Sequence, residues 1–140
     1  MEAEQIVMSQ EMTGVILAAG KGSRIDPFNA HFPKPLLPIA NQPIIQHHID
    51  IFRSLNIHKI KIVVGHLMDK IITHFGKGKD FGVEIEYVEQ QSTLGIAHAV
   101  GQLGNVINGS FLLVLGDIYY APKNLDLMVK QFEAQGGGAV

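Results

Sequence analysis

The chain contains no cysteine, and this absence removes several kinds of chemistry. Disulfide bonds, a thiolate nucleophile and cysteine-ligated zinc are excluded, so a bound metal would have to be held by oxygen or histidine. The sequence also lacks any apolar run near the roughly 20 residues that a membrane-spanning helix needs. Its first residues do not follow the charged, apolar and small-residue pattern of a secretory leader. We therefore expect a cytoplasmic protein with no membrane partner.

The chain also has little net charge of either sign. The 140 residues carry a formal net charge of −2, whereas binding of nucleic acid through bulk electrostatics needs a positive excess, so we expect no nucleic-acid partner. Hydrophobic residues make up 46% of the chain, enough for a core that buries roughly two thirds of the unfolded surface. Residues 1–12 are polar and aperiodic, and we predict a loose N-terminal extension there, followed by one domain or part of one over residues 13–140.

Strand-like and helix-like segments alternate along this domain. Apolar, β-rich runs predict strands over residues 15–18, 59–65, 83–89 and 111–115. Helical spacing of apolar residues predicts helices over residues 43–55, 67–75, 94–107 and 125–135, the first opened by a proline. Such alternation is typical of βαβ units, so we predict an α/β fold around a parallel sheet.

The segment after the first expected strand combines flexible glycines with cationic side chains. Gly20 and Gly22 let backbone N–H groups approach an anion, and Arg24 can hold two phosphate oxygens at once. Lys34 adds a mobile positive charge, so the segment predicts a phosphate site. Two common phosphate motifs do not fit: Ile25 stands where the dinucleotide fingerprint needs its third glycine, and the P-loop pattern is absent.

Residues 20–38 read GKGSRIDPFNAHFPKPLLP. This run resembles the signature of the sugar-phosphate nucleotidyltransferases, G-x-G-S/T-R-x-x-P-x-S/T-x-x-x-P-K-P-L-L-P. One position departs, because Asn29 stands where the family has Thr or Ser, although it keeps a hydrogen-bonding side chain. The resemblance extends from about Gly14 onward. Family members are substantially longer, so we expect the chain to be a truncated domain, namely its N-terminal, nucleotide-binding part.

The resemblance implies a Rossmann-like, doubly wound, mainly parallel sheet with helices on both faces, in which the first and fourth strands are neighbours. It also implies transfer of a nucleoside monophosphate from a nucleoside triphosphate to a sugar 1-phosphate, which gives an NDP-sugar and pyrophosphate. A non-catalytic regulatory or assembly subunit on the same fold is the alternative. The fourth strand of a truncated domain would present an open edge, so self-association into a homo-oligomer is a further expectation.

The resemblance assigns roles to the glycine-rich segment and the lysine after it. Arg24 would hold the departing pyrophosphate, and Lys34 would neutralise charge between the nucleotide α-phosphate and the sugar phosphate; these are the expected catalytic residues. Ser23 is expected to donate a hydrogen bond to phosphate. The expected nucleotide-binding residues in this part of the chain are Leu17, Ala19, Gly20, Gly22 and Ser23.

Asp117 follows the apolar run 111–115 and a glycine. A carboxylate in this place can hold Mg²⁺ and bridge it to phosphate oxygens, or it can cap the following turn. The resemblance favours the first role, because Asp117 matches the metal-binding aspartate of the family. Mg²⁺ is therefore the expected cofactor.

Residues 90–97, QQSTLGIA, are similar to the Q-x-x-x-x-G-T-A stretch of the same family. By resemblance, the Gln90 amide pairs with the edge of the base and Gly95 lets the backbone approach it, with dTTP or UTP favoured. Ile96 departs from the pattern, since it replaces the usual Thr. From the residues alone, a glutamine before a helix such as Gln90 is most often a solvated loop residue, and a glycine such as Gly95 most often belongs to a turn.

The chain has seven histidines, which raises the question of a histidine metal site. His47 and His48 are adjacent and point to different faces of one expected helix. No histidine pair has the i, i+4 spacing of a helical metal site, so we predict ordinary helix-surface or interface roles.

Overall fold

A computed structural model describes residues 11–20, 31–90, 95–121 and 123–136. Three of the expected phosphate-site residues, Gly22, Ser23 and Arg24, lie outside these ranges. The predicted N-terminal extension also lies outside them, except for Glu11 and Met12.

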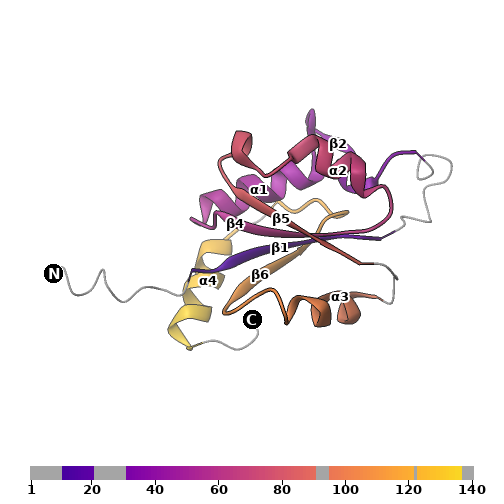
Figure 1. The fold of residues 1–140 in the computed structure, drawn as a ribbon. Helices are drawn as coiled ribbons and strands as arrows, with labels where there is room; N and C mark the ends of the chain where they lie inside the picture. Colours follow the sequence, from indigo (N-terminus) through magenta and orange to yellow (C-terminus); the bar gives the residue numbers. More distant parts are fainter. Residues whose placement is uncertain (1–10, 21–30, 91–94, 122, 137–140) are drawn as a thin grey trace.

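The described residues form a parallel four-stranded sheet, built from β1 (Thr13–Ala18), β4 (Lys59–Val64), β5 (Glu84–Glu89) and β6 (Phe111–Leu115). Its strand order is β5-β4-β1-β6, so β1 is an inner strand and β6 is its neighbour, as predicted. In the register, Ile16 pairs with Ile62 of β4 and Val114 of β6. The short apolar runs of the sequence thus become the hydrogen-bonded centre of the molecule (Figure 1).

Helices cover both faces of this sheet, because successive residues of β1 point to opposite sides. On one face Ile16 packs with α1 (Ile44–Ser54) and α2 (Met68–Phe75); on the other, Val15 packs with α3 (Ile96–Leu103). Figure 1 shows α1 and α2 above the sheet and α3 below it. The predicted doubly wound α/β architecture is confirmed.

Most element boundaries differ from the prediction by one or two residues, and two of the differences are informative. Pro43 precedes α1 as its N-cap instead of opening the helix, since it belongs to a short strand. The third helix ends at Leu103 instead of residue 107, because Gly101 and Gly104 supply no side chain to stabilise further turns.

A small hairpin between residues 38 and 43 was absent from the predicted elements. It consists of β2 (Pro38–Ile39) and β3 (Gln42–Pro43), joined by Ala40 and Asn41, both with positive φ. Two consecutive positive φ angles match the twist of a two-residue hairpin turn. A 3-10 turn, η2 (Lys34–Leu36), precedes the hairpin, and a second one, η3 (Lys79–Phe81), precedes β5.

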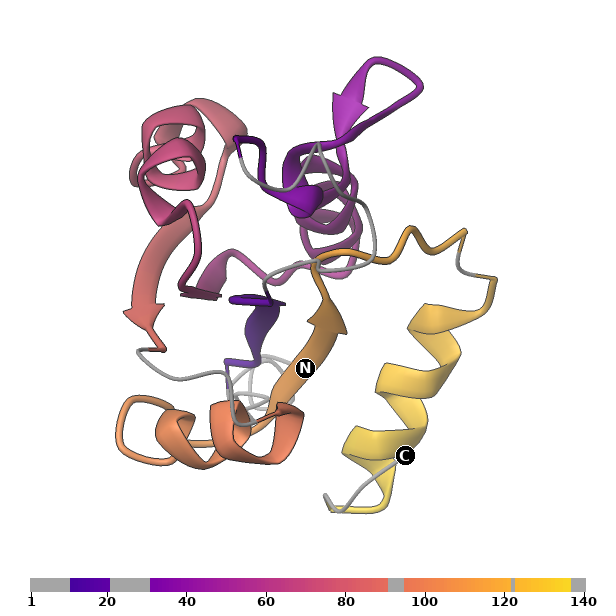
Figure 2. The ribbon, with the colours of Figure 1, turned by 90° about the vertical axis from the view of Figure 1, so that its right-hand side faces the viewer.

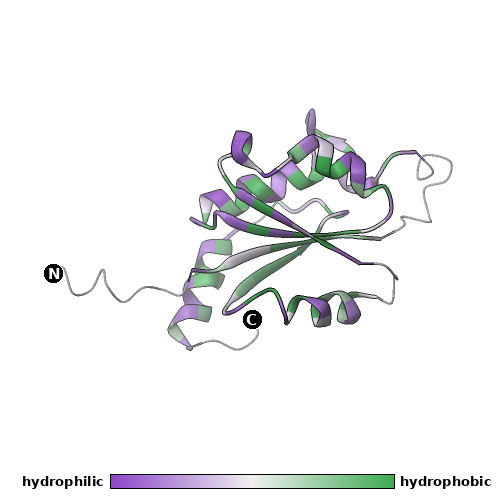
Figure 3. Cartoon of the chain, in the orientation of Figure 1, coloured by the Kyte–Doolittle hydropathy of each residue, from purple (hydrophilic) through white to green (hydrophobic). Residues whose placement is uncertain are grey.

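The β6 side of the sheet is open within the described ranges. β6 is paired with β1 alone and is hydrophobic along its length, as Figure 3 shows. The last helix, α4 (Leu125–Ala134), stands on this side of the molecule (Figure 2) and has no buried residue. Across the described part of the chain, no helix is long and apolar enough to cross a membrane.

Candidate functional site

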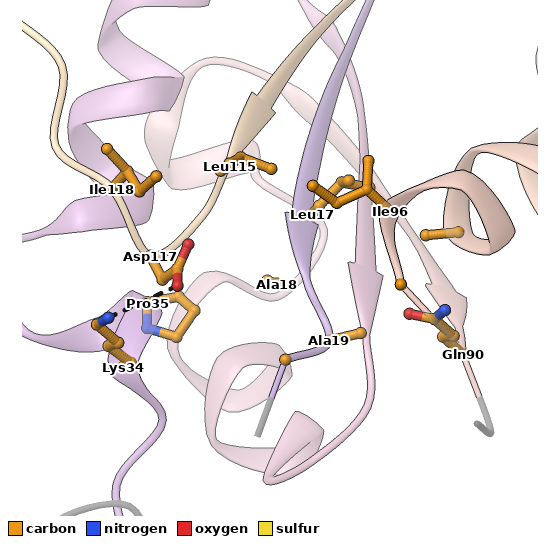
Figure 4. Close-up of a pocket in the computed structure, with 13 residues that line it drawn as sticks. Leu17, Ala18, Ala19, Lys34, Pro35, Gln90, Ile96, Leu115, Asp117 and Ile118 are labelled. Carbon is orange, nitrogen blue, oxygen red and sulfur yellow. Dashed lines mark ion pairs between the residues drawn. The ribbon is translucent and has the colours of Figure 1, made fainter. Parts of the chain in front are cut away.

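A cavity of about 290 Å³ lies at the edge of the sheet where the parallel strands have their carboxyl ends. In doubly wound folds this edge is the usual ligand site. The ends of β1, β5 and β6 line the cavity together with η2 and the beginning of α3. Its walls, as far as they are formed by described residues, are mainly apolar, and the polar side chains among these residues are those of Lys34, Gln90 and Asp117 (Figure 4). Few polar groups in an apolar cleft are typical of small-molecule sites.

Asp117 and Lys34 meet on one side of this cavity. Their Oδ2 and Nζ atoms are 3.7 Å apart, and both side chains are partly exposed. Lys34 is brought there by η2 and Asp117 by the turn after β6. Two residues that are far apart in the sequence thus form one ion pair, as expected if both act on the same ligand.

Gly116 is the reason that Asp117 lies so close to the end of β1. Its N–H donates to the carbonyl oxygen of Leu17 over 2.8 Å. A Cβ at this position would be 2.9 Å from that same oxygen. Only glycine therefore lets the chain leave β6 in contact with β1.

The end of β1 supplies small residues and open space. Ala18 and Ala19 are buried, whereas a Cβ on Gly20 would meet no protein atom within 4 Å. Packing within the described residues therefore does not require glycine at position 20, and Gly20 lines the cavity without a side chain.

Gln90 lies across the cavity from the ion pair, at the end of β5. Its side chain is buried, with the residue only 7% exposed, and its backbone N–H donates to Val64 over 2.8 Å. The side-chain Nε2 lies 3.2 Å from Nδ1 of His98 on α3. Sequence reasoning found Gln90 but missed His98, because the contact bridges eight residues and its histidine sits inside a helix.

Gly95 directly precedes α3 with a φ of +92°, a value that side chains rarely adopt. Ile96, the next residue, is 55% exposed and lines the cavity as an apolar surface. The sequence pattern that residues 90–97 resemble has Thr at this position. Ile96 therefore offers an apolar contact where that pattern offers a hydroxyl group.

The predicted helix-surface role is wrong for His48, which is fully buried under the chain segment that follows Asp117. Its ring lies 5.4 Å from that of Tyr120. Burial lowers the pKa of His48 from its usual value, a shift that nearby backbone at Leu115 and Ile118 partly opposes. Neither ring nitrogen reaches hydrogen-bond geometry with a described residue. The signal was present, because position 48 belongs to the same helical stripe as Ile45 and Phe52.

His47, the preceding residue of α1, contacts the β2–β3 hairpin as well as the segment after Asp117. Its Nε2 lies 2.7 Å from the carbonyl oxygen of Ile39 in the β2–β3 hairpin, to which it donates. Its ring meets Tyr119 edge to face, with centroids 5.1 Å apart. The pair of histidines thus ties α1 to both the hairpin and the segment after Asp117.

Among the described residues, no group of three or more histidine, aspartate or glutamate side chains is arranged to hold a metal ion. Of the described residues that line the cavity, Asp117 alone carries a carboxylate, and that carboxylate is paired with the ammonium group of Lys34. A divalent cation there would need its other oxygen ligands from a phosphate substrate and water, which is how Mg²⁺ commonly binds.

The family model for nucleotidyl transferases matches residues 13–140, and the chain belongs to this family. One relative is a bifunctional protein GlmU from Methanococcus maripaludis, 42% identical over 109 residues, which are 78% of this chain and 25% of the relative. Another is the UTP–glucose-1-phosphate uridylyltransferase AglF from Haloferax volcanii, 34% identical over 91% of this chain and 52% of its own length.

Solved structures agree with these relatives. A Bacillus anthracis structure assigned as a glucose-1-phosphate thymidylyltransferase, in complex with a sucrose, superposes with a TM-score of 0.83 and 32% identity. The match covers 89% of this chain and 51% of that one. The chain therefore spans between about a quarter and a half of the length of these relatives.

Proposed function

We propose that this chain is the nucleotide-binding part of a cytoplasmic sugar-1-phosphate nucleotidyltransferase. The reaction is the attack of a sugar 1-phosphate oxygen on the α-phosphorus of a nucleoside triphosphate, with release of pyrophosphate. The observation that carries the proposal is the Lys34 and Asp117 pair at the cavity mouth, with the buried amide of Gln90 across from it. The phosphates would lie at Lys34 and Asp117, and the base would lie at the Gln90 amide.

The roles of the charged residues follow from this placement. Lys34 is within 3.7 Å of Asp117 and partly exposed, so its ammonium is free to turn toward phosphate oxygens when they enter the cavity. There it would offset negative charge that builds up at the α-phosphate, which is the main form of catalysis in phosphoryl transfer. Arg24 is proposed to hold the pyrophosphate.

Asp117 is the residue proposed to hold Mg²⁺. Its carboxylate oxygens are the ligand type that Mg²⁺ prefers, and its present partner is another cation. When bound, Mg²⁺ would neutralise phosphate charge and orient the triphosphate. No second described carboxylate is needed at the cavity, because Mg²⁺ usually keeps several waters and phosphate oxygens as ligands.

A uracil or thymine base is proposed to lie against Gln90, which makes UTP or dTTP the favoured nucleotide. The relatives support this choice, since one is named for UTP and another is assigned as a thymidylyltransferase. Leu17 and Ile96 offer apolar surface to the base. The one-sided pairing of β6 supports the further proposal of self-association through this edge, which sedimentation at increasing concentration would test.

The experiment is a thermal unfolding series with UTP, dTTP, CTP, GTP and ATP, each with Mg²⁺ and with a chelator. A nucleotide at a hundredfold its Kd should stabilise the chain by about 2.7 kcal/mol. We expect a selective, Mg²⁺-dependent shift that Asp117→Asn removes. Asp126→Asn is the matched control, because Asp126 is an exposed carboxylate on α4.

The outcomes separate the two functional hypotheses. A shift that is absent with every nucleotide would contradict the proposed site and favour a non-catalytic subunit on the same fold. An equal loss in the Asp117→Asn and Asp126→Asn variants would instead show that the metal role of Asp117 is wrong.

A further inference from the structure

We propose that His98 is a positioning residue that holds the side-chain amide of Gln90 in one orientation and thereby makes the site prefer uracil or thymine over cytosine. The inference rests on the proposed function, in which the base lies at Gln90. The juxtaposition that carries it is the 3.2 Å contact between Gln90 Nε2 and His98 Nδ1 at the cavity wall.

The direction of this hydrogen bond follows from the atoms. An amide nitrogen only donates, so His98 Nδ1 must accept, and the proton of the neutral imidazole is then on Nε2. His98 lies in the first turn of α3, and its backbone is fixed by the helix. Gln90 is 7% exposed, so its amide is held away from bulk water, which would otherwise satisfy either orientation.

A glutamine amide has two orientations of nearly the same shape, in which the oxygen and nitrogen exchange places. His98 distinguishes them. Turning the amide over would bring Oε1, an acceptor, against the accepting Nδ1, unless His98 moved its own proton to that nitrogen. With the proton of His98 on Nε2, one orientation therefore has a hydrogen bond and the other has two opposed lone pairs.

This choice decides what the cavity presents to a base. In Figure 4 the Gln90 oxygen lies on the side nearer Ala19, Lys34 and Asp117, and the nitrogen lies toward α3. The oxygen is thus an acceptor directed at the ligand, and the second N–H of Nε2 is a donor beside it. Uracil and thymine present a ring N–H next to a carbonyl, which matches this order. Cytosine has an unprotonated ring nitrogen in the same position, so two acceptors would face each other.

The test measures the Kd of UTP and of CTP for three variants of the chain. His98→Leu removes the acceptor at similar volume. His98→Asp keeps an acceptor that cannot donate, at the same distance from the backbone, and an acidic residue is tolerated in the first turn of a helix. Gln102→Leu, one turn further along α3 and away from the cavity, controls for disturbance of the helix.

We expect the wild-type chain to bind UTP more tightly than CTP. In His98→Leu this preference should fall by about threefold to tenfold, the value of one neutral hydrogen bond. In His98→Asp both affinities should fall together, because of the added negative charge near the triphosphate, while their ratio stays. Gln102→Leu should keep both the affinities and the ratio.

A purely structural role for His98 would lower UTP and CTP binding equally in His98→Leu, and this result would overturn the inference while leaving the nucleotide site intact. A ratio lost equally in His98→Asp would overturn it as well. Failure of the wild-type chain to bind any nucleotide would overturn the proposed function and this inference together. The hydrogen bond itself is visible without nucleotide, because the Gln90 side-chain amide signals should shift in NMR spectra of His98→Leu and not of Gln102→Leu.

Discussion

Replacement of Gly116 by alanine tests how the site is assembled. A Cβ at this position would lie 2.9 Å from the Leu17 carbonyl oxygen and 3.1 Å from Ile16 Cγ2, and contacts below 3.0 Å are essentially never observed. Both neighbours belong to the central strand, so neither can turn aside. The chain after β6 must move away, which breaks the 2.8 Å hydrogen bond from Gly116 to Leu17.

We expect Gly116→Ala to cost about 1–3 kcal/mol, the usual range for forcing extra atoms into a packed region. The ion pair between Lys34 and Asp117 contributes little to this loss, because exposed pairs are worth about 0–1 kcal/mol. Urea unfolding measures the change in free energy. Nucleotide titration with Mg²⁺ measures the displacement of Asp117, which should appear as weaker binding.

Gly101→Ala provides the matched control. A Cβ there would meet no atom within 4 Å, and the residue lies inside α3. The same substitution should therefore stabilise the chain by about 0.5–1 kcal/mol through better helix propensity. If Gly116→Ala were as stable as the wild type and bound nucleotide equally well, the close approach of β6 to β1 would not be what positions Asp117.

Four other predictions concern three single side chains. Burial lowers the pKa of His48, so its imidazole binds a proton more readily in the unfolded chain than in the folded chain. The free energy of unfolding should therefore have its full value above pH 6.5 and fall as the pH drops below 6.5. His48→Leu should make the free energy of unfolding less dependent on pH, which urea titrations at several pH values would measure. Burial raises the pKa of Tyr87 to about 12, so its contribution to stability is complete below pH 10.0 and lost as the pH rises toward 12. The chain has three tyrosines, so Tyr87 is identified as the part of the absorbance titration that Tyr87→Phe removes, and a removed part near pH 10.0 would contradict the prediction. Tyr87→Phe, which removes the 2.6 Å bond to Gly76, should cost about 1 kcal/mol in urea unfolding. Under the proposed function, Lys34→Met should slow NDP-sugar formation by about a hundredfold with little change in nucleotide affinity, and equal losses in rate and affinity would refute its proposed role in the transition state.

Much of the fold was readable from the sequence, because its strands and helices have strong and distinct periods. The run 111–115 has no polar residue and predicts a strand, and β6 has these bounds, although none of its residues is fully buried because one side of the strand is unpaired among the described residues. The neighbourhood of β1 and β6 followed from the family resemblance, and the strand order confirms it. Lys34 and Asp117 were both named from the sequence, and the fold brings them together.

The parts that sequence reasoning missed depend on an unusual local backbone conformation or on the direction in which a side chain points. The β2–β3 hairpin turns at Ala40 and Asn41, and alanine is not a residue that predicts positive φ. His48 was assigned to the surface because its polarity was weighed above its place in the helical stripe. The partnership of Gln90 with His98 depends on the angle between β5 and α3, which local periodicity does not encode.

The strand order has a consequence for when the site exists during folding. The pairing of β1 with β6 joins segments that are further apart in the sequence than any other pair of neighbouring strands in the sheet. Closing that long loop costs more conformational entropy than forming the β1–β4 or β4–β5 pairs. We therefore expect β6 to pair with β1 later in folding than the other strands pair with their neighbours. Asp117 follows β6 directly, so its ion pair with Lys34 can form only after β6 has paired with β1. The strands β1, β4 and β5 and the helices α1, α2 and α3 all leave the ribosome before β6 does, so they are available for pairing and packing while the nucleotide cavity still lacks the wall that carries Asp117.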